Sequence, residues 1–142
     1  MRFFFLFSLL ALLNSCITLQ APQVKAISNL KTSGLLSANP HVKFDIQMYN
    51  PNAISLALTD FNVNVSYGNL SLALLHLDTL QDVAAQSNFT VPLSFQPSKE
   101  QINNILQSGL GMFNQGNESK VKGTGSIRVR KFIFGKTFNF SF

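Results

Sequence analysis

The sequence predicts an all-β fold, an antiparallel β-sandwich of about seven strands with one short helix. Apolar and polar residues alternate in several short segments, as they do in strands that bury one face. Pro, Gly and Asn turn signals separate these segments. A single later segment shows apolar residues at helical spacing instead. The pattern therefore favours one domain built from two sheets.

The alternation gives the bounds of the expected strands. They cover residues 24–32, 42–49, 61–67, 70–77, 89–95, 127–129 and 137–142. Residues 70–77, which follow the Gly68-Asn69 turn signal, are more continuously apolar than the others. Such a run predicts a strand that is covered on both faces.

One amphipathic helix is expected between two late strands, from Lys99 to about Met112. Ser98 is a suitable N-cap, and Gln101 completes a capping box three residues later. Apolar residues then recur near helical spacing, at Ile102, Ile105, Leu106, Leu110 and Phe113. This spacing predicts a helix with one face on the sandwich.

The first fifteen residues have the pattern of a secretory signal peptide: an Arg, an apolar run and a small residue before the cleavage point. The run from Phe3 to Leu13 is shorter than the roughly 20 residues that a membrane-spanning helix needs. Leu13-Asn14-Ser15-Cys16 resembles the bacterial lipobox, which implies cleavage between Ser15 and Cys16 and lipid attachment at Cys16. We therefore expect a signal peptide at 1–15, a lipidated tether at 16–22 and a folded domain at 23–142. The alternative is an ordinary signal peptide cut elsewhere.

Basic residues are concentrated in the last quarter of a chain whose net charge is +5. Lys120, Lys122, Arg128 and Arg130 share one parity, so a strand would place them on one face. This face is a candidate membrane contact, because cations near anionic headgroups each contribute about 1 kcal/mol. The plainer alternative is the solvated face of an edge hairpin. Nucleic acid is not expected as a partner of an exported chain.

Residues with catalytic potential are sparse. His41 is expected at a strand start, and His76 has Asp78 two positions on, which favours a structural pair over a catalytic dyad. No Ser lies in a nucleophile-elbow pattern, and the His residues lack the spacing of a metal site. Gly123-Thr124-Gly125, inside a strand pattern, predicts a bulge or a close backbone approach. The sequence indicates no enzyme, no metal and no cofactor.

Asn50-Pro51-Asn52 follows an alternating strand and precedes a second one. Pro51 fixes the first φ of a turn and Asn52 tolerates left-handed backbone angles. The motif, the later helix and the glycine-containing final hairpin together resemble the late embryogenesis abundant type 2 family, also called the water-stress and hypersensitive-response domain. The resemblance implies a fibronectin-III-like or immunoglobulin-like sandwich. It transfers the turn but no catalytic residue.

The same resemblance implies a function in desiccation or stress tolerance, and bacterial members of the family are often small lipoproteins. We expect a non-catalytic, membrane-anchored envelope domain with a protective or binding function. The alternative is a carrier or sensor of an apolar ligand such as a lipid. The expected partners are the membrane, through acylated Cys16, and an envelope protein or lipid client. Ile17 after the cysteine favours the outer membrane, facing the periplasm.

Overall fold

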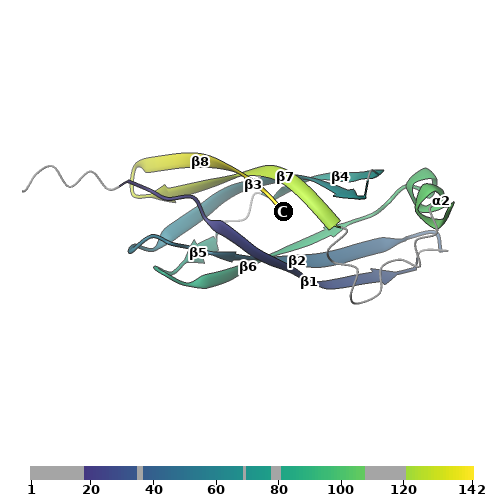
Figure 1. The fold of residues 1–142 in the computed structure, drawn as a ribbon, viewed down its shortest axis with the longest axis horizontal. Coiled ribbons are helices and arrows are strands. Elements are labelled where there is room, and N and C mark those ends of the chain that lie inside the picture. The colour runs from purple at the N-terminus through teal and green to yellow at the C-terminus, as the bar shows by residue number, and fades with distance from the viewer. Residues whose placement is uncertain (1–17, 35–36, 69, 78–80, 108–120) are drawn as a thin grey trace, which may run out of the picture.

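Two antiparallel sheets, packed face to face, form the sandwich (Figure 1). The computed structural model describes residues 18–34, 37–68, 70–77, 81–107 and 121–142. One sheet has the order β1 (Gln23–Ser33), β2 (His41–Tyr49), β6 (Asn88–Phe95). The other has the order β4 (Leu70–Leu77), β3 (Leu56–Tyr67), β7 (Val121–Lys131), β8 (Phe134–Ser141), and β5 (Gln81–Val83) also pairs with β3. Helix α2 (Lys99–Gln107) follows β6 in the chain and lies at one end of the sandwich.

The predicted fold class is confirmed. Three strands face four long ones, as expected of a fibronectin-III-like sandwich, and all the strand pairs are antiparallel. The described part of the chain has eight strands against about seven expected, because β5 adds a short one. The helix begins at Lys99 as predicted, and residues 108–112 of its expected length lie outside the described residues.

The core lies between the two sheets, where the apolar residues of the alternating segments face one another as predicted. In β2, Val42, Phe44, Ile46 and Met48 are at most 1% exposed. Across the sandwich, β3 and β7 contribute a second buried set: Leu56, Leu58, Phe61, Val63, Val65, Tyr67, Val121, Ile127 and Val129. Burial of these side chains on both inner faces removes apolar surface from water and stabilises the pairing of the sheets.

A bulge near Thr59 explains why β3 is longer than predicted. The register to β7 shifts between Leu58 and Asp60. The extra residue changes the side-chain parity, so Leu58 and Phe61 both face the core although they are three positions apart. Strict alternation holds only from Phe61 onwards, and the prediction therefore began the strand there rather than at Leu56.

The expectation that residues 70–77 are covered on both faces is wrong. β4 lies at the edge of its sheet, where Leu72 is buried and Leu74 is 78% exposed. Its apolar composition therefore does not arise from burial between two layers. The outward face of the strand carries Leu74 and His76, opposite Asn64 and Asn62 of β3.

The two glycines of β7 confirm the predicted close approach of the backbone. A Cβ on Gly125 would lie 2.0 Å from the carbonyl oxygen of Asn62. A Cβ on Gly123 would lie 2.2 Å from the ring of Phe142, which occupies that space. The register between β3 and β7 is continuous through this region, so the glycines mark close packing and not a bulge.

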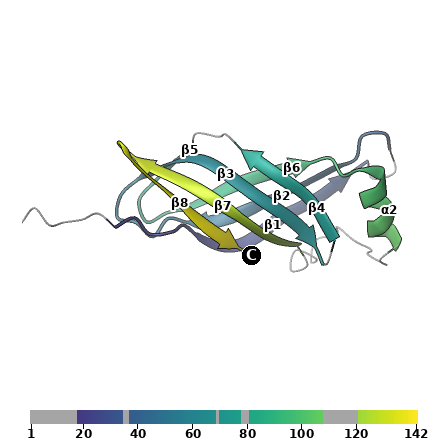
Figure 2. The same cartoon turned by 90° about the horizontal axis from the view of Figure 1, so that it is seen from above.

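The sandwich is elongated, and its two ends differ. The start of the described chain and the β7–β8 hairpin tip lie at one end of the long axis (Figures 1 and 2). Helix α2 lies at the other end, beside the β3–β4 hairpin. The turns from β2 to β3 and from β5 to β6 share the first end, and hydrogen bonds connect them.

Candidate functional site

The Asn50-Pro51-Asn52 turn is a buried polar structure and not a surface loop. Asn50 is fully buried, and its Nδ2 donates to the carbonyl oxygens of Ile54, at 3.1 Å, and Ala84, at 2.8 Å. Its Oδ1 accepts from the backbone N–H and the Nδ2 of Asn52, at 3.0 and 2.8 Å. Every hydrogen-bonding group of the Asn50 amide is therefore used, as a buried amide requires.

Asn52 extends this structure to the N-terminal segment. Its Oδ1 accepts from the N–H of Gln20 at 2.8 Å, and its Nδ2 donates to the carbonyl of Gln20 at 3.0 Å. We call Gln20, Asn50 and Asn52, with the carbonyls of Ile54 and Ala84, the polar clasp. Sequence reasoning predicted the turn but missed the clasp, because Gln20 and Ala84 lie 32 and 34 positions from their partners.

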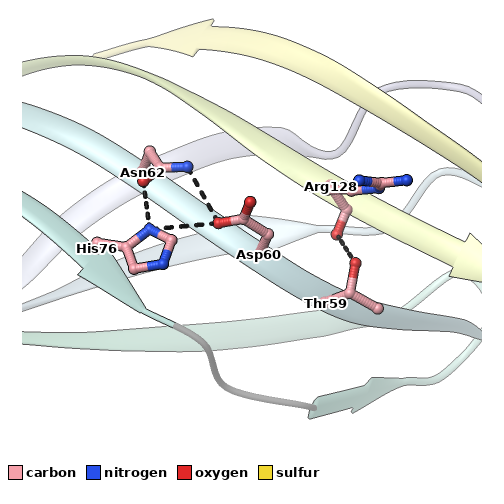
Figure 3. A network of polar contacts seen from close by, with 5 residues as sticks. All are labelled: Thr59, Asp60, Asn62, His76 and Arg128. Atoms are coloured by element: carbon pink, nitrogen blue, oxygen red, sulfur yellow. Dashed lines mark hydrogen bonds and ion pairs between the residues drawn. The ribbon is translucent and has the colours of Figure 1, made fainter.

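A second polar cluster lies on the outer face of β3 and β4 (Figure 3). His76 Nδ1 contacts Asn62 Oδ1 and lies 3.5 Å from Asp60 Oδ1, while Asn62 Nδ2 donates to the same oxygen at 3.0 Å. The expected partner of His76 was Asp78, which lies outside the described residues. The partners that the structure provides come instead from the neighbouring strand.

This cluster fits a structural cross-strand contact. Asn62 and His76 stand opposite each other in the β3–β4 register, the position at which polar side chains pair across a sheet. His76 is about half exposed, so solvent competes for its interactions. Among the described residues, no three His, Cys, Asp or Glu side chains are grouped closely enough to hold a metal ion.

His41 occupies the first position of β2, at the predicted strand start. Its Nε2 lies 3.3 Å from Nε2 of Gln96, just past the end of β6, so one hydrogen bond can join the ends of two neighbouring strands. The contact is exposed and has a structural explanation.

The candidate basic face is distributed along β7. Lys122, Arg128 and Arg130 are exposed on the outer side of the strand, and Lys120 lies outside the described residues. Lys122 and Arg130 are eight positions apart, on the order of 27 Å in an extended strand. β7 is not an edge strand, because it pairs with β3 on one side and β8 on the other. Because the hairpin tip follows Lys131, Arg128 and Arg130 lie near it, and Lys122 lies at the opposite end of the strand.

Phe132 and Phe134 follow that basic face in the sequence. In the structure they form the tip of the β7–β8 hairpin with Ile133, and all three are strongly exposed. Ser15 and Cys16, the expected cleavage and lipid-attachment residues, lie outside the described residues. Within the described part, no helix is long and apolar enough to cross a membrane.

Five chains among the solved structures match this protein. One is a protein from Archaeoglobus fulgidus, known from a crystal structure, with 6% sequence identity and a TM-score of 0.52. The match covers 84% of this chain and 92% of that chain, and at this identity it shows the fold alone. Comparison with the curated proteins gives no match.

The sequence itself identifies the family. A family model described as late embryogenesis abundant protein matches residues 45–141, from within β2 to the end of β8. The matched range includes the polar turn at Asn50, the capped helix and the final hairpin. The chain therefore belongs to the late embryogenesis abundant type 2 family.

Proposed function

We propose that this chain is a lipid-anchored domain of the bacterial cell envelope that protects or binds envelope components during drying or osmotic stress. The family suggests a stress-related role without catalysis. The anchor and the envelope location rest on the lipobox pattern that ends at Cys16. Ile17 after the cysteine favours the outer membrane, with the domain facing the periplasm.

The observation that carries the proposal is the short connection between Cys16 and the polar clasp. Gln20 is tied to Asn52 by two hydrogen bonds and is only four residues from Cys16. Four extended residues span at most about 14 Å. An acylated Cys16 would therefore hold this end of the sandwich at the membrane surface. The three acyl chains of a bacterial lipoprotein exceed the two signals that stable attachment needs.

The alternative, a carrier of an apolar ligand, needs a cavity of suitable size. One cavity between the sheets, lined by Leu58, Phe61, Leu77, Gln81, Val91 and Pro92, has a volume of about 60 Å³. Pockets for small molecules usually have at least about 300 Å³. Between β3 and β8, the ring centres of Phe61 and Phe140 lie 5.0 Å apart, so these rings pack together rather than around a space. A larger hollow of about 510 Å³ lies open to solvent among mostly polar, exposed residues: Lys25, Gln47, Asn88, Phe89 and Thr90. Neither space is an enclosed apolar cavity of ligand size, so the packing favours the protective or binding function.

Intact mass spectrometry of the protein purified from its own membranes tests the anchor, with the Cys16→Ser chain as control. We expect a new N-terminus at Cys16 that carries acyl chains, and no such modification in the variant. An unmodified chain cleaved elsewhere would refute the lipid anchor.

The stress function needs a separate test. In a strain that lacks the protein, survival after drying is compared for cells that express the wild-type chain or the Cys16→Ser chain. The proposal requires rescue by the wild type and a clear loss of rescue without the anchor. Equal survival of the deleted and complemented strains would contradict it. Lipid that co-purifies with the folded domain at one molecule per chain would support the carrier function instead.

A further inference from the structure

The β7–β8 hairpin ends in three large apolar residues that contact little else. Phe132, Ile133 and Phe134 are 80%, 88% and 69% exposed. We call these three residues the apolar tip. Single exposed apolar residues are common on protein surfaces, but three consecutive ones at a projecting turn form a continuous apolar patch.

The backbone of the apolar tip is strained. Lys131 pairs with Phe134, so Phe132 and Ile133 form a two-residue turn. Phe132 has a φ of 53°, in the left-handed region that Gly, Asn and Asp occupy readily in such turns. A bulky aromatic residue there opposes folding by strain, and its exposure means that little burial energy offsets this cost. Strain of this kind persists where it serves a function, so the apolar tip is a candidate functional element.

Three cations follow the apolar tip along its two strands. Arg130, Lys131 and Lys136 lie on the two strands just behind it. Lys131 Nζ donates to Ser55 Oγ at 2.7 Å and lies 5.2 Å from the centre of the Phe132 ring. Ala57 of β3 pairs with Arg130 of β7 on one side and with Asp82 of β5 on the other. The acidic Asp82 is therefore two strands away from Arg130. An apolar end followed by a band of cations matches the order of layers in an anionic bilayer, with the acyl chains below the phosphates.

The apolar tip also lies at the end where the membrane is expected. The described chain starts at this end of the long axis (Figures 1 and 2). Two contacts support this placement: Gln20 binds Asn52, and Lys131 binds Ser55, three residues further along. The β2–β3 turn therefore connects the hairpin tip with the segment that leads back to Cys16.

We propose that the apolar tip inserts into the interface of an anionic lipid bilayer, with Arg130, Lys131 and Lys136 at the phosphates. The inference rests on the proposed function for its membrane, because the anchor brings this end within reach. It assigns the membrane contact to the tip of the hairpin and not to the length of β7. The sandwich then stands on the membrane at its anchored end, with helix α2 directed away.

The chain contains no Trp, so a single introduced Trp reports its own environment. The test uses the full-length Ile133→Trp chain in vesicles of phosphatidylglycerol and brominated phosphatidylcholine, which quenches Trp fluorescence only within the bilayer. Leu74→Trp is the matched control, because Leu74 is also strongly exposed but lies on edge strand β4. We expect strong quenching and a blue-shifted emission for Ile133→Trp, and neither for Leu74→Trp.

The cations are tested by combining Ile133→Trp with Lys131→Gln or Lys136→Gln. Each neutralisation should reduce the ratio of inserted to free tip about fivefold in anionic vesicles, since one cation near such a surface contributes about 1 kcal/mol. In vesicles of phosphatidylcholine alone, the substitutions should have little effect. An effect of equal size in both lipids would contradict the assigned position of the cations.

The two proposals can fail separately. Unquenched, solvent-exposed Ile133→Trp in a chain that carries acyl groups on Cys16 would overturn the insertion and leave the anchor intact. Quenching in a chain with unmodified Cys16 would overturn the anchor and support the insertion. Ile133→Trp emission that shifts only on dimerisation, without lipid quenching, would show that the apolar tip binds a second copy of the chain and would refute insertion.

Discussion

Asn50 shows how one buried amide can hold three segments together. It joins the end of β2, the start of β3 and the chain before β6 through hydrogen bonds to Asn52, Ile54 and Ala84. We expect Asn50→Ala to reduce the free energy of unfolding by about 2–4 kcal/mol, because it leaves buried carbonyls without a donor. Urea denaturation measures the loss.

Asn52→Ala is the comparison for that experiment. It releases Gln20, which lies nearer the solvent, and removes one of the two donors to Asn50 Oδ1, while the Asn52 N–H still donates to that oxygen. A smaller loss of about 1 kcal/mol is therefore expected. Equal losses for the two variants, or a loss below about 1 kcal/mol for Asn50→Ala, would show that the clasp contributes little to stability.

Gly125 and Gly135 form a matched pair for testing the close approach in the final hairpin. A Cβ at Gly125 meets the backbone of β3 at 2.0 Å, whereas the nearest atom to a Cβ at Gly135 is 3.7 Å away. Gly125→Ala should cost about 3 kcal/mol or more, since backbone must move. Gly135→Ala should change stability by less than about 0.5 kcal/mol. Thermal unfolding of both variants gives the answer, and similar melting temperatures would contradict the prediction.

Tyr67 predicts an alkaline limit to stability. Burial raises the pKa of its hydroxyl above the ordinary 10.0. The folded state therefore binds this proton more tightly than the unfolded state does. The resulting contribution to the free energy of unfolding is fully present below pH 10.0 and declines as the pH rises above that value. Unfolding by urea should therefore become easier above that pH, and less steeply in Tyr67→Phe. Identical pH slopes for the two proteins would exclude Tyr67 as the cause.

At the residue scale, sequence reasoning succeeded where the partners are neighbours in the chain. The turn at Asn50-Pro51-Asn52 and the approach at Gly125 are local signals, and the structure contains both, although Asn52 does not adopt a positive φ. The ring of His76, in contrast, contacts Asn62, fourteen positions away. Long-range partners depend on the strand register, which alternation alone does not specify.

At the scale of elements, the N-terminus of α2 combines a local cap with a tertiary contact. The predicted capping box is confirmed: the Ser98 N–H donates to Gln101 Oε1 at 2.8 Å, and the Gln101 N–H donates to Ser98 Oγ at 3.2 Å. Gln101 Nε2 also donates to the carbonyl of Leu72 in β4. One side chain therefore both starts the helix and holds it against the edge of the sheet.

Gln101→Glu separates these two contributions. The carboxylate still accepts from the Ser98 N–H, but it cannot donate to Leu72 and repels that carbonyl. A loss of about 1–2 kcal/mol is expected in chemical denaturation. Ser98→Ala, which removes the cap, should cost about 1 kcal/mol. If Gln101→Glu is neutral, the contact to β4 does not hold the helix.

The elements that sequence reasoning missed have identifiable causes. β5 has three residues, too few for an alternating pattern to be recognised. The bulge at Thr59 interrupts the alternation of β3. Leu74 gave β4 the composition of a covered strand although it faces solvent. Composition indicates how apolar a segment is, but only the sheet order determines which strand lies at an edge.

At the scale of the whole molecule, the sheet order predicts where the structure opens last. β3 pairs with strands on both sides, as do β7 and β2, while β1, β4, β6 and β8 are edges. Native-state hydrogen exchange should therefore be slowest for amides of β2, β3 and β7. Slower exchange in β1 or β8 than in β3 would contradict this order.

The fold class could be predicted from the sequence because the alternation of apolar and polar residues and the turn signals are local features. The pairing of β3 with β7, some sixty positions later in the chain, was not. The placement of the apolar tip at the same end of the sandwich as the N-terminal segment depends on the same long-range pairing. The sequence therefore supplied the apolar and basic residues of that end but not their common location.

The polar clasp also determines how the molecule responds to a pulling force. The start of the described chain and β1 both lie along the long axis (Figure 1). Tension on the N-terminal segment acts first on the two hydrogen bonds between Gln20 and Asn52. Beyond them it runs parallel to β1, whose hydrogen bonds to β2 lie across the direction of pull and are strained together, in shear. A domain dragged by its N-terminus therefore resists extension along its mechanically strongest direction, with the clasp as the first link to open.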